Sequence, residues 1–233
     1  MKRHGIRPAM LIVDSIFTSD GILPEEPGFL KGAVEAIRRA GGIFVADEVQ
    51  PGFGRTGSHM WGFQRHGIDP DIVTLGKPMG NGQPIAGLLT RHDVVEEFGK
   101  KSRYFNTFAG NAVSCAAAAA VLMVIRRDRI MDNARDVGAY LLSKIDALRA
   151  RHDCLGNVRG AGLFVAADIV ADRETQASDR DRTTRVVNAM RDNGVLISAC
   201  GADHNILKIR PPLIFSRENV DLFVDVLDKA LEA

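Results

Sequence analysis

The sequence has little of what marks a membrane protein, a nucleic-acid-binding protein or a secreted protein. No apolar run approaches the roughly 20 residues that span a bilayer; the longest, 116–125, is rich in alanine and precedes two arginines. The formal net charge is +1, which gives no electrostatic basis for binding nucleic acid or an anionic membrane. A very short apolar run broken by Asp14 follows the basic start, so no signal peptide is expected.

Cysteines and histidines are also too few and too widely spaced to predict a disulfide framework or a metal site. The three cysteines are widely spaced and odd in number, which predicts ordinary thiols in a reducing compartment, by default the cytoplasm. The six histidines are scattered without metal-ligand spacing, so we expect no metal site. A composition of 45% hydrophobic and 25% charged residues is typical of a globular protein with a substantial core.

Short apolar runs alternate with a helical pattern in the first half of the chain. Strands are predicted at 9–17, 42–49, 71–77 and 85–91, and a helix at 29–40 that ends in two arginines before two glycines. Continuous β-branched runs separated by helices favour an α/β fold. We expect a mostly parallel sheet that is buried by helices on both faces.

Longer helices dominate from about Asn111 onward. The pattern predicts helices at 111–127, 131–152, 183–194 and 216–233, strands at 158–170, 195–200 and 206–213, and a charged surface loop at 171–182. We therefore expect two domains. Residues 1–129 would form part of a large α/β domain with a linking helix, and 130–233 a smaller C-terminal α/β domain.

Charged residues stand at the ends of two apolar strands. Asp47 and Glu48 end "IFVADEV", and Lys77 follows "DIVTLG". A solvated strand end and a surface lysine are the ordinary interpretations of each signal alone. Ligands in open α/β sheets bind outside the carboxyl ends of strands, however, and side-chain alternation directs only one of the two acids there.

A carboxylate and a lysine at the ends of two strands in one sheet fit a pyridoxal phosphate site. The lysine can form a Schiff base with a carbonyl. The carboxylate can pair with the protonated ring nitrogen, which keeps the ring an electron sink. The combination therefore favours a pyridoxal phosphate site.

Three ordered stretches carry a family resemblance. The segments "FLKGAVEAIRRAGGIFVADEVQPGFGRTG", "GIDPDIVTLGKPMGNGQPIAG" and "NTFAGNAVSCAAAAAVL" resemble the class III aminotransferases of the fold type I pyridoxal phosphate-dependent enzymes. The resemblance covers essentially the whole chain. "KPMGNG" and "LKIRPPL" are most similar to the branch that includes ethanolamine-phosphate phospho-lyases. The family resemblance implies that this chain is the C-terminal part of the family fold, because members of the family carry a long segment before the point where this chain begins.

The resemblance implies which residues hold the cofactor, pyridoxal 5'-phosphate. Asp47 matches the acid that pairs with the pyridine nitrogen, and Lys77 matches the Schiff-base lysine. Val49 matches the residue packed on the ring, and Gln50 the side chain near its phenolic oxygen. Glu48 matches no catalytic role and is expected to be a solvated strand-end acid.

Two further residues follow from the same resemblance. Thr107 matches a hydroxyl that reaches the cofactor phosphate of the neighbouring subunit, which implies a homodimer with its active site at the interface. Arg210 matches the arginine that clamps the substrate carboxylate. The implied reaction is transfer of an amino group from an amine or amino acid to a keto acid. A phospho-lyase acting on a phosphorylated amino alcohol and an inactive truncated domain are the alternatives.

Overall fold

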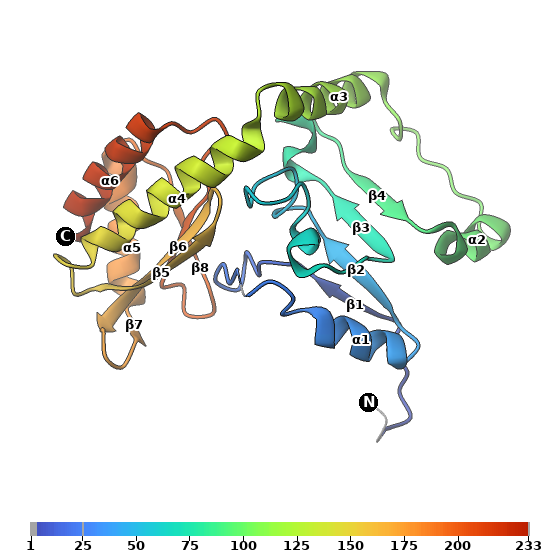
Figure 1. Cartoon of the computed structure of the whole chain (residues 1–233), viewed down its shortest axis with the longest axis horizontal. Coiled ribbons are helices and arrows are strands. Elements are labelled where there is room, and N and C mark those ends of the chain that lie inside the picture. Colours follow the sequence, from blue (N-terminus) through green and yellow to red (C-terminus); the bar gives the residue numbers. More distant parts are fainter. Residues whose placement is uncertain (1–3, 25, 233) are drawn as a thin grey trace. The chain divides into compact units, whose positions relative to one another are not determined.

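The computed structural model describes residues 4–24 and 26–232, which form two compact units (Figure 1). The first unit is built from residues 4–15, 26–54 and 59–129. The second is built from 16–24, 55–58 and 130–232, so it takes two short segments from the first half of the chain. The assignment of these units to the large and small domains of the family stays a prediction.

The first unit contains a four-stranded, mostly parallel sheet in the order β1-β2-β3-β4. β1 (Met10–Val13), β2 (Ile43–Asp47) and β3 (Ile72–Leu75) are parallel, and β4 (Gly87–Thr90) pairs with β3 in the antiparallel direction. Helix α1 (Lys31–Arg39) packs on β1 and β2. The α/β class and the mostly parallel sheet are therefore confirmed.

The strand predicted at 9–17 differs from β1 in both length and burial. β1 has only four residues, and Met10 and Ile12 are 55% and 52% exposed. Among the described residues, β1 is an end strand of the sheet and pairs only with β2. Ile16, which the prediction placed in this strand, is fully buried in the second unit instead.

Within the residues that the structure describes, the first unit has four further helical elements. They are η2 (Gly62–His66), η3 (Lys77–Gly80), α2 (His92–Lys101) and α3 (Ala112–Arg127). The sequence pattern did not predict α2, which buries none of its residues. α3 begins where predicted because the Asn111 side chain caps it, with Oδ1 accepting the N–H groups of Val113 and Ser114 at 3.0 and 3.2 Å.

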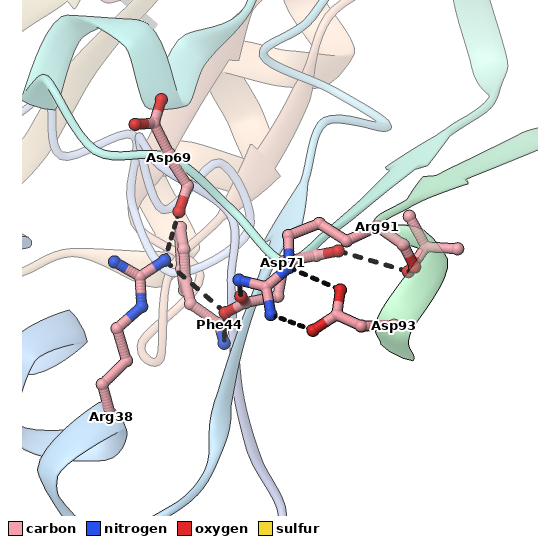
Figure 2. A network of polar contacts seen from close by, with 7 residues as sticks. Arg38, Phe44, Asp69, Asp71, Arg91 and Asp93 are labelled. Atoms are coloured by element: carbon pink, nitrogen blue, oxygen red, sulfur yellow. Dashed lines mark hydrogen bonds and ion pairs between the residues drawn. The ribbon is translucent and has the colours of Figure 1, made fainter. Parts of the chain in front are cut away.

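The buried carboxylate of Asp71 joins three strands of the first unit to helix α1 (Figure 2). Its Oδ2 accepts the Phe44 N–H at 2.8 Å, and its own N–H donates to the Phe44 carbonyl at 2.8 Å. Arg91 Nη1 donates to Oδ1 at 2.6 Å, and Arg38 Nη2 lies 3.5 Å from Oδ2. Arg38 also donates to the Asp69 carbonyl. These partners offset the free-energy cost of a buried charge.

The second unit is an antiparallel sheet covered on one face by helices. Its strands are β5 (Leu155–Ala161), β6 (Phe164–Asp172), β7 (Ala177–Ser178), β8 (Ser198–Cys200) and β9 (Ile206–Ile209). Its helices are α4 (Ile130–Leu148), α5 (Arg180–Asp192) and α6 (Arg217–Leu231). The strands run in the order β5-β6-β9-β8, with β7 paired to β6. Leu207 and Ile209 of β9 belong to a core cluster that includes buried residues of all three helices. Figure 1 shows these helices beside the sheet.

Two sequence predictions in the second unit need correction. The single strand expected at 158–170 is a hairpin of β5 and β6 that turns at Gly162, whose φ of 56° favours glycine. A Cβ on Gly162 would also lie 2.5 Å from the Arg55 carbonyl oxygen. The loop expected at 171–182 contains β7 and the start of α5, which Asp179 caps by accepting the Arg182 N–H at 2.9 Å.

No helix in the described ranges, 4–24 and 26–232, is long and apolar enough to cross a membrane.

Burial along α6 gives a matched test of the second core. Leu227 is fully buried, whereas Leu222 on the same helix is 61% exposed. We expect Leu227→Ala to lower the free energy of unfolding by about 2–5 kcal/mol, because it removes buried methyl groups and leaves a cavity. Leu222→Ala should cost less than about 1 kcal/mol. Urea unfolding followed by circular dichroism measures both, and equal losses would contradict this description of the core.

Candidate active site

The carboxyl ends of β2 and β3 lie side by side in the first sheet. Asp47, the last residue of β2, pairs in register with Thr74 of β3. Asp47 Oδ1 accepts the Val49 N–H at 3.1 Å and the Thr74 Oγ1–H at 3.3 Å. Both hydrogen bonds use the same oxygen, so within the described chain Oδ2 is available to a cation.

Lys77 follows the end of β3 on the same edge of the sheet. It is the first residue of η3, and its side chain is exposed. Val49 packs over the preceding residue, since a Cβ built on Gly76 would lie 3.6 Å from both Val49 methyl groups. Gln50, the next residue after Val49, is half-buried. The structure therefore brings Asp47, Val49 and Lys77 to one edge of the first sheet.

The other two predicted site residues lie elsewhere in the chain. Thr107 is exposed in a turn between α2 and α3. Arg210 belongs to the second unit, directly after β9, and its side chain is exposed. Its Nη1 lies 3.5 Å from Ser198 Oγ.

Glu48 is fully buried, so the expectation of a solvated acid is wrong. Its Oε2 accepts the Gly62 N–H at 2.7 Å and its Oε1 the Phe63 N–H at 2.8 Å. A Cβ at position 62 would meet Ser15 Oγ at 2.1 Å, so glycine is required for this close approach. Burial raises the pKa of Glu48 to about 7, opposed by the two backbone hydrogen bonds and reinforced by nearby acids. Glu48 thus anchors η2 behind the Asp47 edge.

A buried histidine supports the same region from η2. His66 Nδ1 accepts the Gly28 N–H at 3.3 Å, which leaves Nε2 to donate to the Ser15 carbonyl at 3.0 Å. These two bonds assign a neutral imidazole protonated at Nε2. Burial lowers the pKa of His66, in agreement with the neutral ring. Scattered histidines in the sequence gave no signal of this role.

No group of three or more histidine, cysteine or acidic residues that could hold a metal ion occurs in the part of the chain that the structure describes.

The Asp47 edge fits the ring of pyridoxal phosphate. Asp47 offers an oriented carboxylate oxygen to a cationic ring nitrogen, and Lys77 offers an amine to an aldehyde. Val49 offers an apolar surface close to the lysine. A mostly parallel α/β sheet with these groups at the carboxyl ends of its strands is the arrangement that a pyridoxal phosphate site of fold type I would use.

Comparison with known proteins places the chain within this class. A family model described as "Aminotransferase class-III" matches residues 5–231. The chain therefore belongs to the class III aminotransferase family. The family assignment and its cofactor-bound structures indicate pyridoxal phosphate as the cofactor.

Relatives in the family differ in the reaction that their names state. "Alanine--glyoxylate aminotransferase 2-like" of Drosophila melanogaster is 41% identical over 218 residues, which is 93% of this chain and 44% of that protein. The structure of a phospholyase from Arthrobacter in complex with phosphoethanolamine has 40% identity and a TM-score of 0.94, with coverage of 100% of this chain and 55% of that one.

An amine transaminase from an uncultivated Pseudomonas species, solved in its PLP-bound form, is also similar in structure. It has 31% identity and a TM-score of 0.87, covering 96% of this chain and 52% of that chain. The chain thus spans about half the length of the proteins that it matches.

The raised pKa of Glu48 predicts a pH-dependent stability. An acid whose pKa rises from 4.5 to about 7 on folding binds more protons in the folded state, so its contribution to stability falls as pH rises between these values. The Glu48→Gln variant has no carboxyl group that titrates at this position. Its amide nitrogen lies opposite one of the two backbone N–H donors, and the resulting loss of stability is the same at every pH. The stability of Glu48→Gln relative to wild type should rise by up to about 3 kcal/mol across this window.

Urea unfolding at about pH 5 and about pH 8 measures this change. Glu35→Gln on α1, where the carboxylate is 67% exposed, is the control and should give a much smaller pH dependence. A Glu48→Gln difference that is the same at both pH values would contradict the raised pKa.

Proposed function

We propose that this chain carries the lysine and acid of a pyridoxal phosphate-dependent aminotransferase, which moves an amino group from an amine or amino acid to a keto acid. The observation that supports this most is the placement of Asp47 and Lys77 at the ends of neighbouring parallel strands. When bound, the cofactor supplies an electron sink for the charge that forms as the substrate loses its α-proton.

Each residue of the proposed site has a stated role. Asp47 pairs through Oδ2 with the protonated ring nitrogen, and the bonds to Val49 and Thr74 fix its orientation. Lys77 Nζ would hold the cofactor through its aldehyde, and once the substrate amine has displaced the lysine, the freed amine would take the α-proton of the substrate as a general base. Val49 would pack on the ring, and Gln50 would lie near its phenolic oxygen. In the second unit, Arg210 is the residue proposed to bind the substrate carboxylate.

We also propose that the enzyme is a homodimer in the cytoplasm, with Thr107 reaching the cofactor phosphate of the neighbouring subunit. The segment around Thr107 exposes large apolar side chains in the isolated chain: Phe105 and Phe108 are 82% and 84% exposed. Aromatic residues are enriched where protein surfaces associate. Their exposure beside Thr107 supports a subunit interface at this place.

Covalent trapping tests the role of Lys77. Borohydride reduction after addition of a low concentration of pyridoxal phosphate should label Lys77 in wild type, as detected by peptide mass spectrometry. Lys77→Ala should carry at least about tenfold less label, because no other lysine is proposed to hold the cofactor. Lys100→Ala, which removes an exposed lysine paired with Glu96, is the control and should label as wild type does. Equal labelling of all three proteins would refute the proposed site.

A phospho-lyase is the second candidate function, favoured by the similarity to the Arthrobacter phospholyase. The same lysine would remove the α-proton, and phosphate would then leave from the neighbouring carbon, followed by release of ammonia. Incubation of the cofactor-loaded protein with phosphoethanolamine distinguishes the two. Aminotransfer should need an added keto acid, whereas the lyase reaction should release inorganic phosphate without one. Phosphate release without a keto acid would replace the first proposal by the second.

A further inference from the structure

The chain turns directly after β2, and this turn orients the Asp47 carboxylate. Asp47 Oδ1 accepts the N–H of Val49, which lies within the turn, at 3.1 Å. That N–H belongs to the peptide bond between Glu48 and Val49, so its direction depends on the backbone of Glu48. The conformation of Glu48 therefore decides which way Asp47 Oδ1 points, and hence which way Oδ2 points.

Glu48 is held by hydrogen bonds to four backbone groups. Its N–H donates to the Thr74 carbonyl at 3.0 Å, and its carbonyl accepts the Gly52 N–H at 3.2 Å. Its carboxylate accepts the N–H groups of Gly62 and Phe63 at 2.7 and 2.8 Å. All of its polar atoms are thus hydrogen-bonded, and because Glu48 is fully buried it cannot exchange these partners for water.

The start of η2 also packs closely on the turn. A Cβ on Gly52 would lie 2.6 Å from the Glu48 carbonyl oxygen and 3.0 Å from the ring of Trp61, so only glycine fits at this position. Trp61 stands directly before η2, and its ring meets that of Phe53 edge-on, with 5.1 Å between the centroids. A shift of η2 is therefore passed on to the turn.

The other end of η2 is fixed to the rest of the first unit. His66, the last residue of η2, is hydrogen-bonded to Gly28 and Ser15. The Glu48 carboxylate is the hydrogen-bonded link between this support and the end of β2. Hydrogen bonds to an ionised acceptor in a site without water are stronger than those between neutral groups. The link therefore holds the turn in one conformation.

We propose that Glu48 is the positioning residue of the cofactor-binding acid: its carboxylate clamps the turn to η2 and so holds Asp47 Oδ2 in the orientation that pairs with the protonated ring nitrogen of pyridoxal phosphate. Glu48 itself contacts neither cofactor nor substrate. The inference rests on the proposed function, because Asp47 is taken to be the partner of the ring nitrogen. It adds that the precision of this pairing is set by a residue with no direct part in it.

Two cofactors that differ in one ring atom test the proposal. Pyridoxal phosphate has the ring nitrogen and its deaza analogue has a C–H group in that place, while both have the aldehyde that Lys77 requires. The measurement is the cofactor concentration that gives half-maximal borohydride labelling of Lys77, read by peptide mass spectrometry. Wild type should need less pyridoxal phosphate than analogue. Asp47→Asn should lose most of this preference, because it removes the negative charge.

Glu48→Gln should reduce the same preference. The glutamine amide nitrogen lies opposite one of the two N–H donors of η2, so the clamp is released at one point. We expect the half-maximal concentration to rise about tenfold for pyridoxal phosphate and less than about threefold for the analogue, since a misplaced carboxylate affects only the ring nitrogen. Equal losses for the two cofactors would show a role in folding alone and would overturn the proposal.

A second substitution separates position from charge. Glu48→Asp keeps the carboxylate but is shorter by one methylene group, so it cannot reach both N–H donors. It should show the same selective loss as Glu48→Gln, whereas retention of the wild-type preference would assign the effect to the charge of Glu48 and overturn the clamp. Glu35→Gln on α1, whose carboxylate is 67% exposed, is the matched control and should label as wild type does with both cofactors.

A milder variant carries the test if substitutions of Glu48 prevent folding. Gln64 is exposed on η2, and its Oε1 accepts the Trp61 N–H at 3.0 Å. Gln64→Ala loosens the start of η2 without a change in the buried acid. It should raise the half-maximal concentration of pyridoxal phosphate about threefold and leave that of the analogue unchanged. No loss, or an equal loss for both cofactors, would overturn the proposal.

Hydrogen exchange without cofactor keeps a failure of this inference apart from a failure of the proposed function. Peptides that cover 48–63 should exchange faster in Glu48→Gln than in wild type, and unchanged exchange would overturn the clamp. A wild type without label on Lys77, or labelled without a preference, would refute the proposed role of Lys77 or of Asp47. A wild type that prefers pyridoxal phosphate, together with equal losses in Glu48→Gln, would refute this inference alone.

Discussion

The carboxylate of Asp71 is the contact on which the first sheet depends. The carboxylate accepts the Phe44 N–H, and the Asp71 N–H donates to the Phe44 carbonyl, so the start of β3 is held to β2. Arg91 and Arg38 compensate the charge of the carboxylate. Once the pairing of two parallel strands is fixed at their start, the register is fixed along both strands, up to their carboxyl ends. Asp47 stands opposite Thr74 as a direct result. The geometry of the candidate site at the carboxyl ends of β2 and β3 therefore depends on a contact at the opposite ends of these strands.

Behind that edge, Glu48 performs a different task from its neighbour. Alternation along β2 turns Asp47 and Glu48 to opposite sides. Asp47 is held by two donors and keeps one oxygen for a ligand, whereas both oxygens of Glu48 are occupied by the backbone of η2. One acid therefore serves binding and the other serves support. The requirement for glycine at position 62 is part of the same support, because any side chain there would collide with Ser15.

The sequence predicted the parts of this architecture that depend on local pattern. The apolar runs of β2 and β3 and the capped start of α3 are visible in the residues themselves, as are Asp47 and Lys77 at strand ends. Helix α2 was missed because it buries no residue and so has no apolar stripe aligned with a core. The burial of Glu48 depends on a segment fourteen residues later in the chain. The pairing of Arg55 with Pro211 spans most of the chain and leaves no local signal.

The two short segments that pack in the second unit make the chain difficult to divide. Ile16 and Ile22 from one of them are fully buried against Phe164 and Ala166 of β6, and the other brings Arg55 to the β5–β6 turn. A fragment that begins at Ile130 would lose both segments, and that face of its sheet would meet water. Cutting the gene at the apparent boundary would therefore yield an aggregation-prone product. An experimental dissection of this protein should keep residues 16–58 attached to the C-terminal half.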